Sequence, residues 1–232
     1  MSYENLPERL REVRDRIDMA LDRGGRVGAE VRIVAVTKTH PLAAVQAARE
    51  AGLSDMGENR VQEMEEKALA SEGESLRWHL IGPLQRNKVK RALPLISLLH
   101  SLDSMRLAQK ISSEATEAGL TTRALVQVNA SGEDSKGGFA PEELADSIGR
   151  MMELPSLELL GLMTMAPYTT DERVLRDTFS RVRVLGEELQ QQVHGFRAQH
   201  LSMGMSNDYE IAVEEGSTLV RLGTVLLGER VQ

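Results

Sequence analysis

The segment VRIVAVTKTHP, residues 31–41, places a lysine just after a run of apolar residues. Residues 31–36 have the composition of a buried strand, and Lys38 follows within two residues. A buried ammonium group is costly unless it is paired or loses its proton. The free amine of a desolvated lysine attacks an aldehyde to form an imine. Lys38 is therefore a candidate imine-forming residue, and the alternative is a solvated lysine at the start of a loop.

Two segments near the C-terminus, GMSND at 204–208 and LGT at 222–224, could hold an anion. Gly204 would let the backbone approach a ligand closely, Ser206 offers a hydroxyl, and the amides of Gly223 and Thr224 can point at phosphate oxygens. The alternatives are that Ser206 or its neighbour Asn207 caps the next helix and that Gly223 is a turn glycine. A phosphate site opposite an imine-forming lysine indicates a phosphorylated aldehyde as ligand.

The elements that must position these residues alternate between apolar strand-like runs and amphipathic helix-like runs along the whole chain. The strands are expected at 31–36, 53–56, 77–81, 97–102, 124–129, 159–165, 200–203 and 219–222. The helices are expected at 6–21, 41–51, 61–70, 87–93, 104–118, 141–152, 172–193 and 208–215.

This alternation predicts an α/β fold, a (β/α)₈ TIM barrel preceded by an additional N-terminal helix. No linker or change of composition divides the chain, so we expect one domain over residues 1–232. The alternative is an open doubly wound sheet, which normally carries a glycine-rich turn after its first strand, whereas TKTHP has no glycine. In a barrel, Lys38 and the two anion-binding segments all follow strand ends, where active sites form.

Composition excludes several classes of protein. The net charge of −7 and the pI near 5.4 argue against a nucleic-acid surface. The chain has no cysteine, which excludes disulfides and thiolate metal sites, and we expect no metal. The charged N-terminus does not resemble a signal peptide and no apolar run is long enough to cross a bilayer, so we expect a cytoplasmic protein that does not bind membranes.

Six blocks of the sequence, in order, carry a resemblance to a known family. They are VAVTKTHP (34–41), GENRVQE (57–63), WHLIGPLQRNK (78–88), VNASGEDSKGGF (128–139), GLMTMAP (161–167) and LSMGMSNDYEIAVEEGSTLVRLGT (201–224). From about residue 6 to residue 228 the chain resembles the YggS/PROSC family of pyridoxal-phosphate-binding proteins, also called pyridoxal phosphate homeostasis proteins. The departures, Leu226-Leu227 where the family often has Ile-Phe and Thr37 where it has serine, do not touch the proposed chemistry.

The resemblance implies a barrel similar to the N-terminal domain of alanine racemase, with pyridoxal 5'-phosphate held as an imine. It implies imine formation by Lys38, phosphate binding at Ser206, Gly223 and Thr224, and an arginine, Arg221, beside the pyridine nitrogen.

The same resemblance places Asn59 in the ring pocket. Leu80, Met163 and Met203 are expected near the faces of the cofactor, with packing in the barrel core as the alternative.

The resemblance also bears on catalysis, for which no catalytic residue is expected. The sequence shows no counterpart of the β domain that supplies the second acid/base group of alanine racemase. Of the three tyrosines that could replace this group, only Tyr168 is expected near the mouth of the barrel. Arg221 facing the ring nitrogen disfavours its protonation and makes the ring a weaker electron sink.

The sequence therefore predicts a monomeric protein that holds the cofactor and passes it to apo-enzymes. The alternatives are an amino-acid racemase or decarboxylase of the alanine racemase type and, less favoured, a cofactor-free Schiff-base aldolase. Transfer could involve Lys136 or a lysine of QRNKVK (85–90), although such surface lysines are usually only solvated charges.

Overall fold

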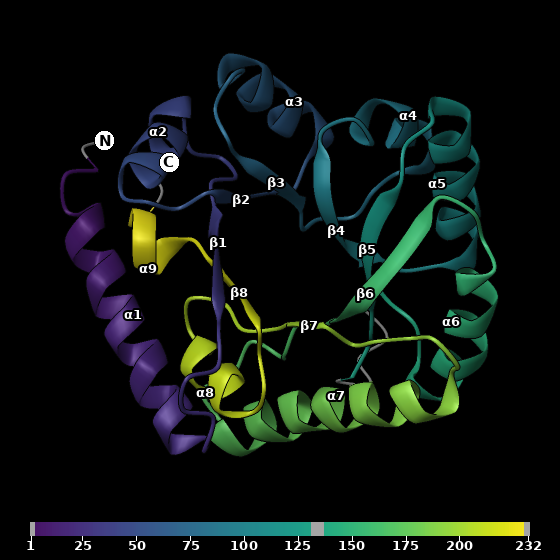
Figure 1. Cartoon of the computed structure of the whole chain (residues 1–232). Coiled ribbons are helices and arrows are strands. Elements are labelled where there is room, and N and C mark those ends of the chain that lie inside the picture. The colour runs from purple at the N-terminus through teal and green to yellow at the C-terminus, as the bar shows by residue number, and fades with distance from the viewer. Residues whose placement is uncertain (1–2, 131–136, 230–232) are drawn as a thin grey trace.

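The computed structural model describes residues 3–130 and 137–229 of the chain. Eight parallel strands close into a barrel in the order in which they occur along the chain, and helices surround it (Figure 1). The strands are β1 (Arg32–Val36), β2 (Asp55–Glu58), β3 (Arg77–Leu80), β4 (Ile96–Leu102), β5 (Thr122–Gln127), β6 (Leu157–Met163), β7 (His200–Ser202) and β8 (Leu219–Leu222). The predicted TIM barrel is confirmed, and the open doubly wound sheet is wrong.

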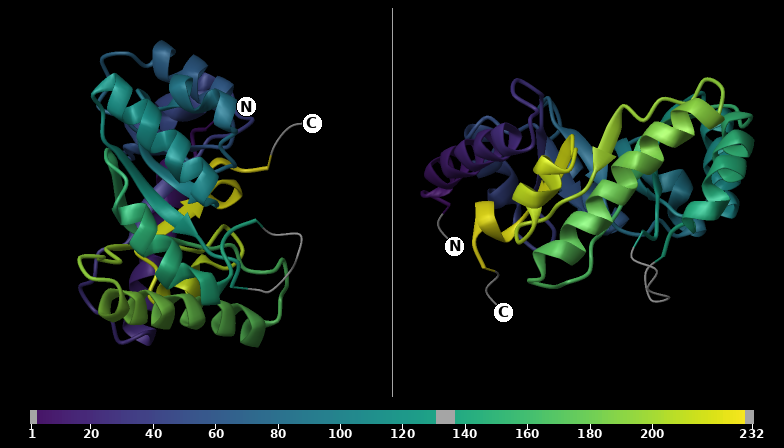
Figure 2. Two further views of the ribbon diagram at one scale, coloured as in Figure 1. Left: turned by 90° about the vertical axis from the view of Figure 1, so that its right-hand side faces the viewer. Right: turned by 90° about the horizontal axis from the view of Figure 1, so that it is seen from below.

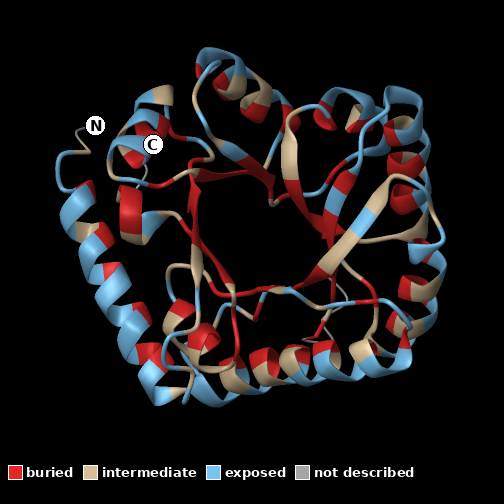
Figure 3. Cartoon of the chain, viewed as in Figure 1, coloured by how far each residue is buried: buried red, intermediate tan, exposed pale blue. Residues whose placement is uncertain are grey.

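The helices form the outer layer, and their inward faces are buried against the strands (Figure 3). They are α1 (Leu6–Arg23), α2 (Leu42–Glu50), α3 (Val61–Ala70), α4 (Val89–Ala92), α5 (Met105–Ala118), α6 (Leu144–Met152), α7 (Glu172–Gln192), α8 (Tyr209–Glu214) and α9 (Thr224–Leu227). Across the described parts of the chain, no helix is long and apolar enough to cross a bilayer.

Helix α1 is the predicted addition to the barrel, and it lies outside α8 and α9 (Figure 2). The side chains at spacings of three and four along its inner face are buried. Arg23 of this helix forms an ion pair with Glu214 of α8 over 2.5 Å. Helix α1 therefore supports the helix that follows the Ser206 segment.

Strands β5 and β6 both start and end two residues earlier than the sequence predicts. Their first cross-strand pairs include Arg123 opposite Glu158, which form an exposed ion pair over 3.0 Å. Because these polar residues lie where the barrel opens to solvent, they carry no apolar signal in the sequence. The predicted bounds therefore followed the uninterrupted apolar runs and missed the first two residues of each strand, of which Arg123 and Glu158 are charged.

The interior of the barrel is only partly apolar. Leu98, Leu125, Met163 and Leu219 form one small apolar cluster inside it. Buried polar side chains also lie there, including His79 of β3 and His100 of β4, whose rings are in contact. Buried polar groups need hydrogen-bond partners, so these side chains must satisfy one another.

Candidate functional site

A cavity of about 520 Å³ opens at the carboxyl ends of the strands. Segments that follow all eight strands contribute to its wall. The lining residues are Val36, Lys38, His40, Asn59, Ile81, Gly82, Pro83, Asp103, Gln127, Gly137, Met165, Tyr168, Met205, Ser206, Asn207, Arg221, Gly223 and Thr224. All six residues that the sequence singled out as candidate cofactor ligands therefore lie on one cavity.

Lys38 lies in the turn that follows β1 and is neither fully buried nor fully exposed. The next residue, Thr39, has a φ of 65°, an uncommon conformation for a residue with a β-branched side chain. The backbone amide of Thr39 donates to Glu63 of α3 over 2.5 Å. This bond holds the backbone in the strained conformation that the lysine's turn requires.

A buried lysine, Lys67 of α3, holds the residue before Lys38 in the same turn. Its ammonium donates to the carbonyl of Thr37 over 2.7 Å, to Glu58 over 2.7 Å and to Glu63 over 2.8 Å. These three bonds use all three N–H groups of the ammonium. Nothing in the sequence pattern indicated Lys67, which holds both neighbours of Lys38, directly at Thr37 and through Glu63 at Thr39.

Glu58 is fully buried at the end of β2, and its Oε1 accepts from Lys67 and from the hydroxyl of Thr37 over 2.6 Å. Its other oxygen has no hydrogen-bond partner among the described residues. Burial raises the pKa of this carboxyl, and the bonds from Lys67 and Thr37 oppose that rise. Glu58 therefore needs the ammonium of Lys67 to remain ionised in this buried position.

Ser206 and the start of α9 form the part of the cavity suited to an anion. The Ser206 hydroxyl accepts from the backbone amides of Gly223 over 3.2 Å and of Val225 over 3.3 Å. The residue before α8 is Asp208, so the expectation that Ser206 or Asn207 might cap that helix is wrong. Of the two amides that contact Ser206, that of Gly223 belongs to a predicted anion-binding residue, and that of Val225 was not predicted.

Gly204 has a different role from the predicted one. It has a φ of 95°, and a Cβ there would come within 2.7 Å of the Ala212 Cβ in α8. Glycine is therefore required by the backbone conformation and by packing against α8. A close approach to a ligand is not needed to explain it.

Arg221 of β8 is the buried cation of the site. One of its terminal nitrogens donates to the carbonyl of Ser202 over 2.8 Å and to the Ser202 hydroxyl over 2.6 Å, and the other donates to the carbonyl of Thr164 over 2.9 Å. Burial lowers the pKa of Arg221 to about 10, with Asp208 opposing the change. At neutral pH the guanidinium stays charged and is held by fixed acceptors.

Asn59 lies just beyond β2, and its position depends on a glycine in the next strand loop. A Cβ at Gly82 would come within 2.5 Å of the Asn59 carbonyl oxygen. The GENR and IGP segments can therefore meet at the cavity only because residue 82 has no side chain.

The apolar walls differ from the expectation. Leu80, Met163 and Met203 are buried in the core and do not line the cavity. Their places are taken by residues one or two positions further along the chain, Ile81, Met165 and Met205. Ile81 points to the opposite side from Leu80 because side chains alternate along an extended chain. Met165 and Met205 lie beyond the ends of β6 and β7, so the segments after these strands form the wall there.

The mouth of the cavity carries Tyr168, which is 94% exposed. His40, Asp103 and Gln127 also line the cavity, although the sequence analysis did not single them out. Each follows or ends a strand, which is the signal that could have identified them. Lys136, the predicted transfer lysine, lies outside the described residues.

Stability between pH 7 and 5 should depend on a buried histidine of the interior, His100. Burial, together with nearby His79 and Arg221, holds its pKa well below the usual value. As the pH falls through about 6.5, His100 takes up a proton in the unfolded chain but stays neutral in the folded chain. The free energy of unfolding is therefore highest above that pH and decreases as the pH falls further. We expect one proton to contribute a slope of about 1.4 kcal/mol per pH unit.

Denaturant unfolding of wild type and His100→Gln across this pH range checks the prediction. The free energy of unfolding should depend less steeply on pH in the variant, because the contribution of His100 is gone. The exposed His194→Gln serves as the control and should keep it. Equal slopes for His100→Gln and wild type would show that His100 is protonated in the folded protein.

Comparison with known proteins gives consistent results. The family model described as alanine racemase, N-terminal domain, matches residues 10–231. The pyridoxal phosphate homeostasis protein of Aquifex aeolicus is 42% identical over 226 residues, which cover 97% of this chain and 99% of the relative. The protein of that name in Pseudomonas aeruginosa is 41% identical over 97% of this chain and 96% of its own.

A solved structure agrees with these sequence relatives. PipY of Synechococcus elongatus PCC7942, solved with pyridoxal phosphate bound, has a TM-score of 0.84 to this chain and 34% sequence identity. The similarity covers 96% of this chain and all of PipY. Together with the family model and the curated relatives, this shows that the chain belongs to the alanine racemase N-terminal domain family and, within it, to the pyridoxal phosphate homeostasis proteins.

Proposed function

We propose that this protein binds pyridoxal 5'-phosphate, holds it covalently through Lys38 and passes it to apo-enzymes, with little or no catalysis of its own. The observation that carries the proposal is the single cavity that Lys38 shares with Asn59, Arg221 and the Ser206–Thr224 pair. The names of the close relatives and the cofactor bound to PipY support it.

The donor set of the cavity fits this cofactor. An amine for the aldehyde, a cation for the ring and a hydroxyl with backbone amides for the phosphate all lie on a wall enclosing about 520 Å³, a volume typical of cofactor sites. When bound, pyridoxal phosphate supplies an aldehyde that condenses reversibly with amines. Reversible attachment suits a carrier, because another amine can take the aldehyde.

Each residue has a separate task in this proposal. Lys38 supplies the attaching amine, and Ser206, Gly223 and Thr224 hold the phosphate. Arg221 stays charged beside the ring nitrogen and so disfavours a proton there.

Ser206→Ala should weaken cofactor binding by tenfold or more, because a hydrogen bond to a charged group contributes roughly 1.5–3 kcal/mol and about 1.4 kcal/mol is a factor of ten. Titration with pyridoxal phosphate, followed by absorbance, measures the change. Ser180→Ala, on α7 away from the cavity, is the matched control and should bind as wild type. Equal affinity in the two variants would place the phosphate elsewhere.

Delivery is tested by mixing the loaded protein with an apo-enzyme and following recovery of that enzyme's activity. The proposal expects recovery faster than the spontaneous loss of cofactor into a large excess of a scavenging amine. Recovery no faster than that loss would mean that the protein only stores the cofactor and releases it into solution. We further propose that it acts as a cytoplasmic monomer, which sedimentation of the purified protein tests for the oligomeric state.

The second candidate is a racemase or decarboxylase using the same cofactor. It needs a proton donor or acceptor across the ring from Lys38, and the one tyrosine lining the described cavity, Tyr168, is almost fully exposed. Incubation of the loaded protein with alanine and other amino acids, followed by chiral analysis, separates the two. Turnover that is lost in Lys38→Ala would favour the enzyme.

A further inference from the structure

A continuous line of hydrogen-bonded side chains leads from Arg221 through the barrel interior to the opposite mouth. The Ser202 hydroxyl lies 2.8 Å from His100 Nδ1. His100 Nε2 lies 2.8 Å from His79 Nδ1, and His79 Nε2 lies 2.8 Å from Asp55 Oδ1. We call Asp55, His79, His100 and Ser202 the interior chain. Its members come from β2, β3, β4 and β7, and all four are buried.

The direction of every bond follows from the two ends of the interior chain. Arg221 can only donate, so the Ser202 oxygen accepts from it. The proton of the buried Ser202 hydroxyl also needs an acceptor, and the described contacts offer it His100 Nδ1 at 2.8 Å. At the other end, hydrogen bonds from Arg77 and His79 lower the pKa of Asp55, although its burial opposes them. The carboxylate therefore only accepts, and His79 donates to it from Nε2.

For the bond between His79 and His100, one placement of the protons then gives every nitrogen a suitable partner. His100 accepts at Nδ1, so a neutral His100 carries its proton on Nε2 and donates to His79 Nδ1. Burial holds the pKa of His100 well below its usual value, which agrees with a neutral ring. The assignment from Ser202 makes His100 Nε2 a donor, and the assignment from Asp55 leaves His79 Nδ1 as an acceptor. The two assignments agree, so each nitrogen of the two rings has a hydrogen-bond partner.

The result for Arg221 is a fixed orientation. Ser202 contributes both its carbonyl and its hydroxyl to the same terminal nitrogen, while Thr164 contributes a carbonyl to the other. The Ser202 hydroxyl accepts from Arg221 and contacts His100 Nδ1 at the same time, so these two contacts fix how the hydroxyl points. Two of the five N–H groups of the guanidinium have no partner among the described residues, and these can face a ligand.

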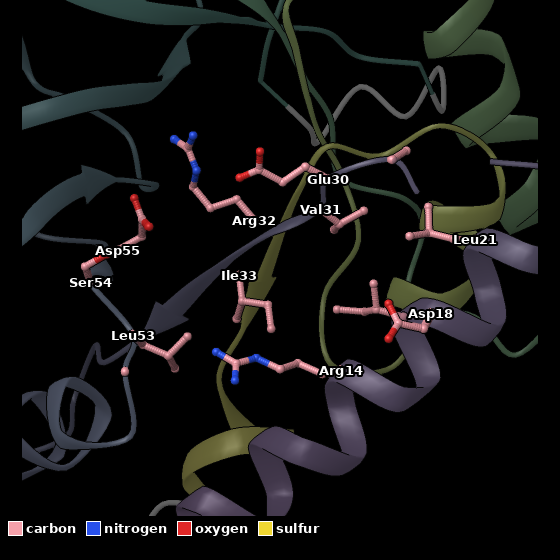
Figure 4. Close-up of a pocket in the computed structure, with 13 residues that line it drawn as sticks. Arg14, Asp18, Leu21, Glu30, Val31, Arg32, Ile33, Leu53, Ser54 and Asp55 are labelled. Atoms are coloured by element: carbon pink, nitrogen blue, oxygen red, sulfur yellow. The ribbon is translucent and has the colours of Figure 1, made fainter. Parts of the chain in front are cut away.

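The far end of the interior chain reaches the amino-terminal mouth of the barrel. Asp55 lines a cavity of about 260 Å³ there, together with Arg14 and Arg32 (Figure 4). Arg77, whose side chain is half exposed, pairs with both oxygens of Asp55 over 2.8 and 2.6 Å. A change at this mouth can therefore alter the hydrogen bonds that end at Arg221.

We propose that Ser202, His100 and His79 are positioning residues, anchored by Asp55, that hold the Arg221 guanidinium facing the ring of the bound cofactor. The inference rests on the proposed function, because it takes the ring to lie beside Arg221. These residues act through Arg221 and do not touch the cofactor. The competing interpretation is a polar network that contributes stability alone.

The first test uses the cofactor-free protein. Nitrogen NMR should show both His79 and His100 with the proton on Nε2, and separate signals for the two terminal nitrogens of Arg221, whose rotation is restricted. Ser202→Ala should merge or broaden the Arg221 signals, and Ser202→Thr, which keeps a hydroxyl, should restore them. A proton on Nδ1 of either histidine, or Arg221 signals unchanged in Ser202→Ala, would overturn the proposal.

The second test uses the loaded protein and cofactor labelled with ¹⁵N in the ring. Ser202→Ala, His100→Gln and Asp55→Asn should each shift the ring-nitrogen signal, and Ser202→Ala should weaken cofactor binding about tenfold. Leu125→Ala, a destabilising change in the apolar cluster of the same interior, is the matched control and should leave the signal unchanged. An unshifted signal in all three variants, or an equal shift in Leu125→Ala, contradicts the positioning role. If wild type binds no cofactor, the proposed function fails, while the cofactor-free spectra still decide whether the interior chain holds Arg221.

Discussion

Replacing Lys38 by alanine is expected to abolish the near-visible absorbance of the cofactor-loaded protein while leaving the fold intact. The absorbance requires a covalent bond between the cofactor aldehyde and an amine, and Lys38 is the lysine among the described residues that lines the cavity. Its backbone turn is held by Lys67 and Glu63, which the substitution does not touch. Spectra recorded during titration with pyridoxal phosphate measure the loss, and circular dichroism checks the fold.

Lys88→Ala is the matched control for this experiment. Lys88 belongs to the QRNKVK segment, and its amine contacts Gln62 over 3.2 Å on the surface, away from the cavity. The control should keep the wild-type spectrum. An unchanged spectrum in Lys38→Ala, or a loss of equal size in Lys88→Ala, would mean that cofactor attachment does not depend on residue 38.

Lys67→Met is expected to be the most destabilising single change near the site. It leaves the fully buried Glu58 carboxylate without its cation, and breaking a buried ion pair in this way costs about 3–5 kcal/mol of unfolding free energy. It also frees the carbonyl of Thr37, so the turn of Lys38 loosens and cofactor affinity should fall together with stability. Denaturant unfolding and cofactor titration measure the two effects.

Two further variants separate the ion pair from the general effect of losing a lysine. Lys67→Met combined with Glu58→Leu removes the fully buried charge together with its cation and should recover most of the stability. Glu63 also loses its cation, but it is partly exposed and still accepts from the Thr39 amide. Lys110→Met breaks a partly buried pair with Glu114, one turn away on α5, and should cost about 0.5 kcal/mol, the value typical of such helix pairs. A loss in Lys67→Met as small as that in Lys110→Met would contradict the role assigned to Lys67.

The architecture was predictable because its signals are local. Each core strand carries an apolar run and each helix an amphipathic repeat, so the alternation indicated the barrel and the order of its strands. The first two residues of β5 and of β6, which include Arg123 and Glu158, and the four-residue helix α9 were not predicted. They are too short or too polar to give a period, and α9 begins only where the Gly223 amide meets Ser206.

The candidate site was predictable to the extent that it lies at strand ends. Lys38 and Ser206 lie in the segments that follow β1 and β7, so their convergence follows from the barrel itself. The residues that hold them could not be found this way, because Lys67 looks like any other lysine of an amphipathic helix. The interior chain is harder still, since His100 and Ser202 are 102 positions apart in the sequence and meet only when the barrel closes.

The most direct test of the account is to locate the attachment site. The loaded protein is reduced with borohydride, digested and analysed by mass spectrometry, which fixes the cofactor to the amine that held it. The account predicts the pyridoxyl group on Lys38 and on no other lysine in stoichiometric amount. A modified peptide that carries Lys88, Lys90 or Lys136 in its place, or no stoichiometric modification at all, would contradict it.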